Sequence, residues 1–209
     1  DPIALVIAET LEQALDAAEQ IDVKYAPLPA KTRIQDALNG GDASDICLNW
    51  SVGDQQATNT AFQSAAHITQ LDFRNHRIVT NSMEPRGGIG EFDISTGRYT
   101  LHISAQSLHM ARDRVAETLG VDATMLRLIA PDVGGGFGVK NFMYPEMVLL
   151  CWAARIAGRP VKWINTRSDG FVSDHQARDN DAQAELALDA YGNFLALRVR
   201  SIGNLGAHL

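Results

Sequence analysis

Apolar residues recur along this chain with the period of a strand in some stretches and with the period of a helix in others, and the two kinds of stretch alternate. Residues 99–105 are apolar at every second position, which is typical of a half-buried strand. Residues 107–119 carry apolar side chains every three or four positions, which predicts an amphipathic helix. Residues 147–157 are apolar nearly all round, so we expect a buried helix that begins at Pro145 and ends at Gly158.

Similar patterns and helix-end signals predict helices and strands in the rest of the chain. Thr10 and Gln13 have the spacing of a capping box, so a helix should start at residue 11. Ser107 and Gly120 are typical of the two ends of the helix between them. Further strands are expected at 3–8, 23–25, 46–51, 68–73, 89–94, 125–130 and 161–164, helices at 32–39 and 54–65, and a long hairpin over 181–202. The mixture predicts an α+β fold.

A glycine-rich segment follows the strand predicted at 125–130. Gly134, Gly135, Gly136 and Gly138 surround Phe137, and glycine lets backbone N–H groups approach a ligand closely. The segment lacks the Gly-Lys-Ser/Thr ending of a Walker A loop and the third glycine of a dinucleotide fingerprint. Two interpretations stay open: a cradle of backbone donors for a ligand, or a tight strand-to-helix turn.

Three polar features are candidates for chemistry. Gln106 lies where a predicted strand meets a helix; its amide could donate to an oxo or carbonyl oxygen, or be an ordinary surface group. Glu84 and Arg86 flank Pro85 and could be an ion pair that faces a cofactor, although a pair at the surface that fixes the loop is favoured. A third group is interpreted as one structural cluster around His175, formed by Asp174, Arg178 and Asp179. The six histidines show no zinc-ligand spacing.

The composition of the chain disfavours several classes of function. The chain has 209 residues, 45% of them apolar, and a net charge of -7, which disfavours general binding to nucleic acid or anionic membranes. No apolar run reaches the roughly 18 residues of a membrane span. Two distant cysteines, Cys47 and Cys151, suit a reducing compartment. The chain starts and stops within strand-like patterns, so we expect it to be a fragment of a longer protein.

Several segments taken together resemble the large, molybdenum-binding subunit of the xanthine oxidase family of molybdenum hydroxylases. The branch most similar is that of aerobic carbon monoxide dehydrogenase large subunits. The order and spacing of the segments make the resemblance specific, and it runs over nearly the whole chain. They are Asn81–Gly87, Ser104–Arg112, Ala130–Lys140, Gly158–Trp163 and Arg167–Asp169.

The resemblance implies a division of the chain and a cofactor site. Residues 1–75 would be the later part of an α/β hammerhead domain, and residues 76–209 the start of a molybdopterin-binding α+β domain. The implied cofactor is molybdopterin with molybdenum, in a cytosine dinucleotide form, and the protein would supply no direct metal ligand. The implied cofactor-binding residues are Gln106, Gly135, Gly136, Phe137 and Gly138, with Gln106 and Phe137 near molybdenum.

The implied activity is that of an oxidoreductase that hydroxylates a small substrate with water as the oxygen source. Carbon monoxide, an aldehyde and an N-heterocycle remain open as substrates. Asn141 stands where purine-oxidising members have glutamate, which disfavours a purine. The family's catalytic glutamate would lie beyond Leu209, so none is assigned here and the fragment alone should be inactive.

The resemblance also implies partners. An iron–sulfur subunit and an FAD subunit would receive the electrons, the rest of the large subunit would complete the site, and the assembly would be a cytoplasmic dimer of heterotrimers. The alternative is a truncated, non-catalytic scaffold or an anion-binding module that keeps the fold.

Overall fold

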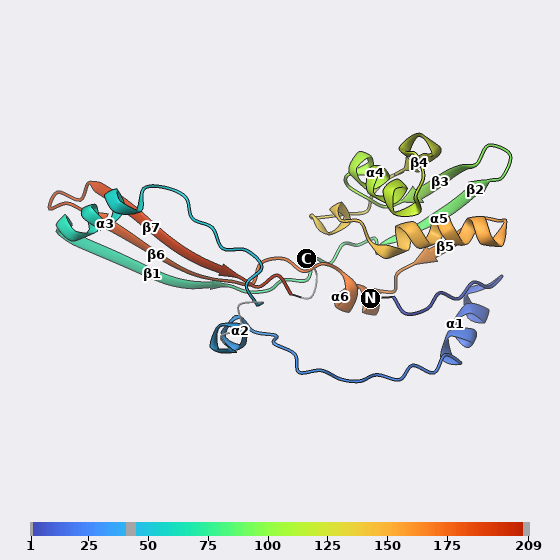
Figure 1. Cartoon of the computed structure of the whole chain (residues 1–209), viewed down its shortest axis with the longest axis horizontal. Coiled ribbons are helices and arrows are strands. Elements are labelled where there is room, and N and C mark those ends of the chain that lie inside the picture. Colours follow the sequence, from blue (N-terminus) through green and yellow to red (C-terminus); the bar gives the residue numbers. More distant parts are fainter. Residues whose placement is uncertain (1, 41–44, 207–209) are drawn as a thin grey trace. The chain divides into compact units, whose positions relative to one another are not determined.

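The computed structural model describes residues 2–40 and 45–206 of the chain. These residues form two compact units, each made from two separate stretches (Figure 1). One unit combines the residues up to Ala26 with Val79–His175, and the other combines Pro27–Ile78 with the residues from Gln176 onward. The assignment of 1–75 and 76–209 to the two family domains stays a prediction.

The first unit is built on a four-stranded mixed sheet whose strand order is β4-β3-β2-β5. β2 pairs antiparallel with both β3 and β5, whereas β3 and β4 run parallel. Helices α4 and α5 pack on one face of this sheet. The strands are β2 (Gly87–Asp93), β3 (Arg98–Ile103), β4 (Leu126–Ile129) and β5 (Val161–Ile164), and the helices are α4 (Leu108–Leu119) and α5 (Pro145–Ala157).

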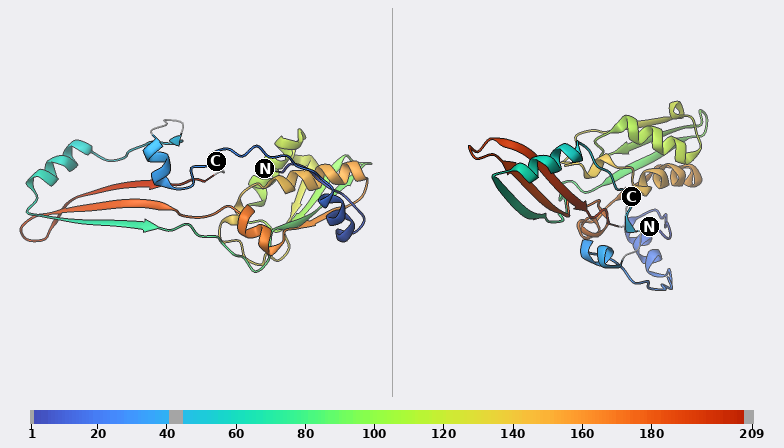
Figure 2. Two further views of the ribbon diagram at one scale, coloured as in Figure 1. Left: turned by 90° about the horizontal axis from the view of Figure 1, so that it is seen from below. Right: turned by 60° about the vertical axis from the view of Figure 1, so that its left-hand side comes forward.

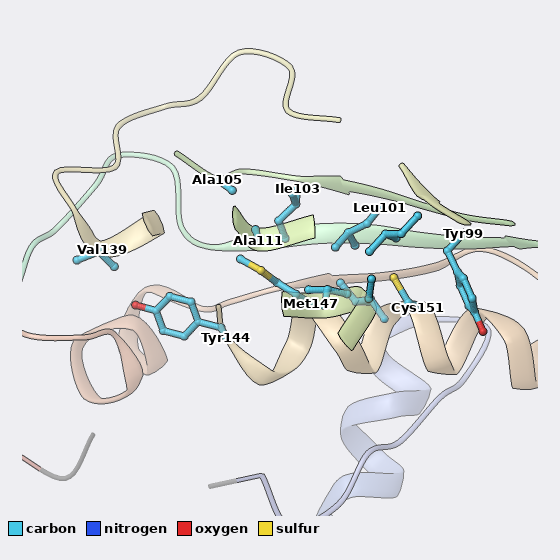
Figure 3. Close-up of a cluster of buried hydrophobic side chains, with 13 residues drawn as sticks. Tyr99, Leu101, Ile103, Ala105, Ala111, Val139, Tyr144, Met147 and Cys151 are labelled. Carbon is cyan, nitrogen blue, oxygen red and sulfur yellow. The ribbon is translucent and has the colours of Figure 1, made fainter. Parts of the chain in front are cut away.

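The core of this unit lies between the sheet and α5. Figure 3 shows Leu101 and Ile103 of β3 directed toward Met147 and Cys151 of α5. Leu101 and Cys151 are fully buried, as the predicted alternation and the apolar helix require. Gly90 of β2 has no room for a side chain because the backbone of α5 crosses it directly. The core therefore fixes β3, whose end leads to Gln106, against the helix that follows the glycine segment.

Local signals for helix ends are largely confirmed. Gly120 and Gly158 both adopt the left-handed conformation that ends α4 and α5. Thr10 and Gln13 form a capping box at α1 (Leu11–Glu19). Ser107 is the N-cap of α4, but its side chain makes no capping hydrogen bond. The remaining short elements of this unit are η2 (Ala123–Met125), η3 (Val139–Asn141) and α6 (Arg167–Ser173).

The second unit contains a long antiparallel sheet in the order β1-β6-β7. These strands run side by side in Figures 1 and 2. Helix α3 packs near one end of the sheet, where Arg198 of β7 lies 4.3 Å from the ring centre of Phe62. The elements are α2 (Ile34–Gly40), α3 (Gln55–Ser64), β1 (His67–Asn75), β6 (Asn180–Leu188) and β7 (Phe194–Gly203). The predicted hairpin is confirmed.

Three predicted strands are wrong. Within the described residues, segments 3–8, 23–25 and 46–51 belong to no strand. Ile3 is 63% exposed and Leu48 is 73% exposed, so these apolar runs pack little. A strand needs a hydrogen-bonded neighbour, and an apolar run cannot specify one by itself. The α+β class is nevertheless confirmed.

The described part of the chain contains no helix with the length and apolar character needed to cross a membrane.

Candidate functional site

The glycine loop, defined here as Gly134–Gly138, connects the segment after β4 to the short helix η3. Its backbone turns through positive φ at Gly135 (96°), Phe137 (49°) and Gly138 (91°). A positive φ is uncommon for a residue with a Cβ, so Phe137 is held by its surroundings. Phe137 is 75% exposed. The loop therefore presents an aromatic side chain on a constrained backbone.

Gln106 lies against this loop. Its side-chain Oε1 accepts a hydrogen bond from the backbone N–H of Gly138 at 2.9 Å. A Cβ added at Gly136 would lie 2.5 Å from the Gln106 amide carbon, so only glycine fits there with Gln106 in this position. Because Oε1 is used as an acceptor, the Nε2 group remains as a donor with no partner in the described residues. The structure thus brings together Gln106 and the loop residues that the sequence analysis singled out.

Three consecutive backbone N–H groups in the loop have no hydrogen-bond partner among the described residues. The amides of Gly135, Gly136 and Phe137 donate to no other group in the described part of the chain. Their neighbours Gly134 and Gly138 are already bonded to side chains. With the Gln106 Nε2 group, the loop region offers four uncommitted donors. Such a set suits a ligand rich in oxygen and nitrogen acceptors.

Glu84 and Lys140 form an ion pair beside the loop. The Lys140 ammonium, 2% exposed, donates to Glu84 Oε2 at 2.8 Å and to Ser104 Oγ at 2.7 Å. The same Oε2 atom accepts from the backbone N–H of Gly134 at 2.7 Å and from Ser104 Oγ at 2.5 Å. Partial burial raises the pKa of Glu84, but together these donors lower it by more than burial raises it. The pKa of Glu84 therefore lies below its ordinary value. Glu84 is therefore ionised at neutral pH.

Arg86 makes a separate set of contacts, so the predicted pairing of Glu84 with Arg86 is wrong. The buried guanidinium donates to Asp174 at 2.7 Å and also to Glu146. It lies over the Tyr144 ring, 3.7 Å from its centre. Tertiary contacts with α5 and with the end of α6 therefore outweigh proximity in sequence. Arg86 holds the start of β2 against the start of α5.

Two members of the cluster predicted around His175 bind side chains outside it. Asp174 binds Arg86 and Asp179 binds Arg77 instead, in different units. The His175 ring stacks on Phe142, with 4.3 Å between ring centres. The chain passes from one unit to the other after His175.

The described ranges, 2–40 and 45–206, hold no group of three or more His, Cys, Asp or Glu arranged to bind a metal ion.

Sequence reasoning missed the role of Lys140 and Ser104. Lys140 was visible at the end of the glycine-rich segment, but nothing in the spacing indicated that Glu84 would be its partner. Ser107 was predicted to cap α4, yet its hydroxyl donates to Asn141. Both contacts join η3 to segments far away in the sequence, and neither is visible in a local pattern.

Comparison with known proteins places the chain among molybdenum enzymes. Residues 39–209 match the model of the molybdopterin cofactor-binding domain. The chain is 31% identical to the carbon monoxide dehydrogenase large chain of Hydrogenophaga pseudoflava, over 98% of its own length and 28% of that protein. It is 33% identical to the gamma subunit of the 6-hydroxypseudooxynicotine dehydrogenase complex of Paenarthrobacter nicotinovorans, over 99% of its length and 26% of that protein.

The fold is similar to solved structures as well. Quinoline 2-oxidoreductase from Pseudomonas putida 86 matches with a TM-score of 0.82 and 33% identity, over 93% of this chain and 25% of that one. The chain thus spans little more than a quarter of the length of these relatives.

Proposed function

Because this chain belongs to the molybdopterin cofactor-binding domain family, we propose that it forms part of the large subunit of a molybdenum hydroxylase. The observation that carries the proposal is the glycine loop, with the exposed side chain of Phe137. Three backbone N–H groups of the loop and the amide of Gln106 donate to no group in the part of the chain that the structure describes. Molybdopterin, when bound, supplies the oxidation–reduction chemistry. The protein residues bind and orient it.

Each of the residues at the glycine loop would have a different part in binding and orienting the cofactor. We propose that Gln106 Nε2 donates to an oxygen on the metal or to the pterin, because a neutral amide adds no charge to the site. The N–H groups of Gly135, Gly136 and Phe137 would donate to polar edges of the cofactor. Gly138 holds Gln106 through the 2.9 Å hydrogen bond. The Phe137 ring would exclude water from the cofactor.

The substrate would be carbon monoxide, an aldehyde or an N-heterocycle. Among the relatives named above, one is a carbon monoxide dehydrogenase large chain and one is a quinoline 2-oxidoreductase. Asn141 accepts a hydrogen bond from Ser107, which favours a structural role for this side chain over contact with a substrate. The cytosine dinucleotide form of the cofactor, and electron transfer to iron–sulfur and FAD subunits, are part of the same proposal.

Metal analysis of the full-length protein tests the proposal. The protein is expressed in a host that makes the cofactor, purified, and measured by mass spectrometry for molybdenum. About one molybdenum atom per large subunit is expected, as for a tightly held cofactor. A full-length protein that contains no molybdenum after cofactor loading would instead be a scaffold or an anion-binding module.

A further inference from the structure

The buried cation Lys140 lies next to the glycine loop. Lys140 follows the loop on η3, and its side chain is 2% exposed. An ammonium in such a place is stable only with a charged partner and further hydrogen bonds. Glu84 provides the charge at 2.8 Å, and Ser104 provides the second acceptor at 2.7 Å.

The partner of this lysine is tied to the opposite end of the loop. Glu84 Oε2 accepts from the N–H of Gly134 at 2.7 Å, and the N–H of Glu84 donates to the carbonyl of Gly134 at 3.1 Å. Two bonds therefore close a ring between Glu84 and the first loop residue. A Cβ at Gly134 would lie 2.5 Å from the Glu84 Cβ, so the contact also depends on glycine.

The lysine backbone completes the connection to Gln106. The Lys140 carbonyl accepts from the N–H of Gln106 at 3.0 Å, and the Gln106 side chain accepts from the N–H of Gly138. Lys140 thus holds Glu84 and Ser104 with its side chain and Gln106 with its main chain. The hydrogen bonds to Gly134 and to the Gln106 main chain therefore come from Lys140 or from its partner Glu84.

We propose that Lys140 and Glu84 are a positioning pair, whose ion bond fixes the glycine loop and Gln106 in the geometry that binds the cofactor. The inference rests on the proposed function. The position of the pair distinguishes it from an ordinary stabilising ion pair: Lys140 is bonded to the site rather than to the strands and helices of the core. Removing the ammonium of Lys140 should therefore make the glycine loop more mobile while the rest of the first unit keeps its stability.

The test compares Lys140→Met with Lys162→Met, a matched control at an exposed lysine on β5. Lys140→Met should still fold, because Glu84 is 39% exposed and its carboxylate stays hydrated when the ammonium is removed. Both variants are made in the full-length protein. Molybdenum content, amide hydrogen exchange across Gly134–Lys140 and thermal unfolding are measured on each.

Lys140→Met should lose molybdenum by about tenfold or more and raise exchange at the Gly134 and Gly138 amides by about tenfold, while amides in β3 and α5 exchange as in the parent. The control should change neither. The double variant Lys140→Met with Glu84→Gln should be no worse than Lys140→Met alone, because both remove one interaction. Unchanged loop exchange in Lys140→Met, or faster exchange throughout the unit, overturns the proposal.

Two other results are possible: the parent protein could lack molybdenum, and Lys140→Met could fail to fold. If the parent protein itself holds no molybdenum, the proposed function fails, and the exchange measurement still decides whether the pair fixes the loop. If Lys140→Met does not fold, Ser104→Ala replaces it, because this change removes the hydroxyl that bonds both members of the pair and so loosens the pair. Faster exchange confined to the loop then supports the proposal, and unchanged exchange overturns it.

Discussion

Gly136 lies so close to Gln106 that a Cβ added to the glycine would lie 2.5 Å from the amide carbon of Gln106. The obstacle is the far end of a flexible side chain, so Gly136→Ala should displace the Gln106 amide and leave the fold intact. We expect the molybdenum content of the full-length protein to fall by about tenfold with little change in unfolding temperature. Gly40→Ala, whose nearest new contact would be 3.5 Å away, is the control. Full metal content in Gly136→Ala would contradict the assigned role of Gln106.

The opposite result is expected at Gly90, where the obstacle is backbone. A Cβ there would lie 2.9 Å from the backbone nitrogen of Cys151 and still closer to the Leu150 carbonyl. Gly90→Ala must push α5 away from β2, which should lower the free energy of unfolding by about 1–3 kcal/mol. Urea denaturation of the two proteins measures this difference. An unchanged midpoint would mean that α5 does not pack so closely.

Arg86 should be among the most important polar side chains for stability. Arg86→Met leaves Glu146 and Asp174 largely buried without their cation, and the loss should be about 3–5 kcal/mol. The control is Arg112→Met, because the Arg112–Asp113 pair is exposed and should contribute about 0–1 kcal/mol. Chemical denaturation compares both variants with the parent, and equal losses would refute this ranking.

The two cysteines should differ in reactivity. Burial raises the pKa of the Cys151 thiol to about 12, so it stays protonated and covered at pH 8. Cys47 is exposed. Iodoacetamide at pH 8 should therefore label Cys47 in the folded protein, and Cys151 only after denaturation. Peptide mass spectrometry identifies the labelled site, and labelling of Cys151 in the folded state would show that its helix opens.

Acid should weaken the second unit through Asp181. Hydrogen bonds from Arg74 and Gln35 lower the pKa of Asp181 to about 2, from an ordinary value of 3.8. A lowered folded-state pKa means that the stabilisation is complete above the unfolded-state value and is lost as pH falls from 3.8 toward 2. Asp181→Asn should flatten the pH dependence of unfolding in this window.

Asp16→Asn, at an exposed position of α1 with no ion pair in the described residues, is the control for this measurement. It should keep the pH dependence of the parent. If Asp181→Asn behaves in the same way as this control, the carboxylate of Asp181 is not the group that titrates.

Much of the fold follows from short stretches of sequence. The alternation at 99–105, the apolar helix 147–157 and the capping signals at Thr10 and Gly120 are local properties, and the structure confirms them. The resemblance to the xanthine oxidase family is also confirmed. The strand predicted at 3–8 is wrong because an apolar run does not specify a hydrogen-bonded neighbour.

The sequence by itself determined the glycine loop, the family and the choice of Gln106 as a candidate. Only the tertiary structure decided which side chains meet there. Glu84 and Lys140 are 56 residues apart in the chain, and Gln106 and Gly138 are 32 apart. No periodicity links positions at such distances, because hydrogen bonds and ion pairs act over a few ångströms in space. The contacts exist because β3 and α5 pack around one core and bring the two ends of the site together.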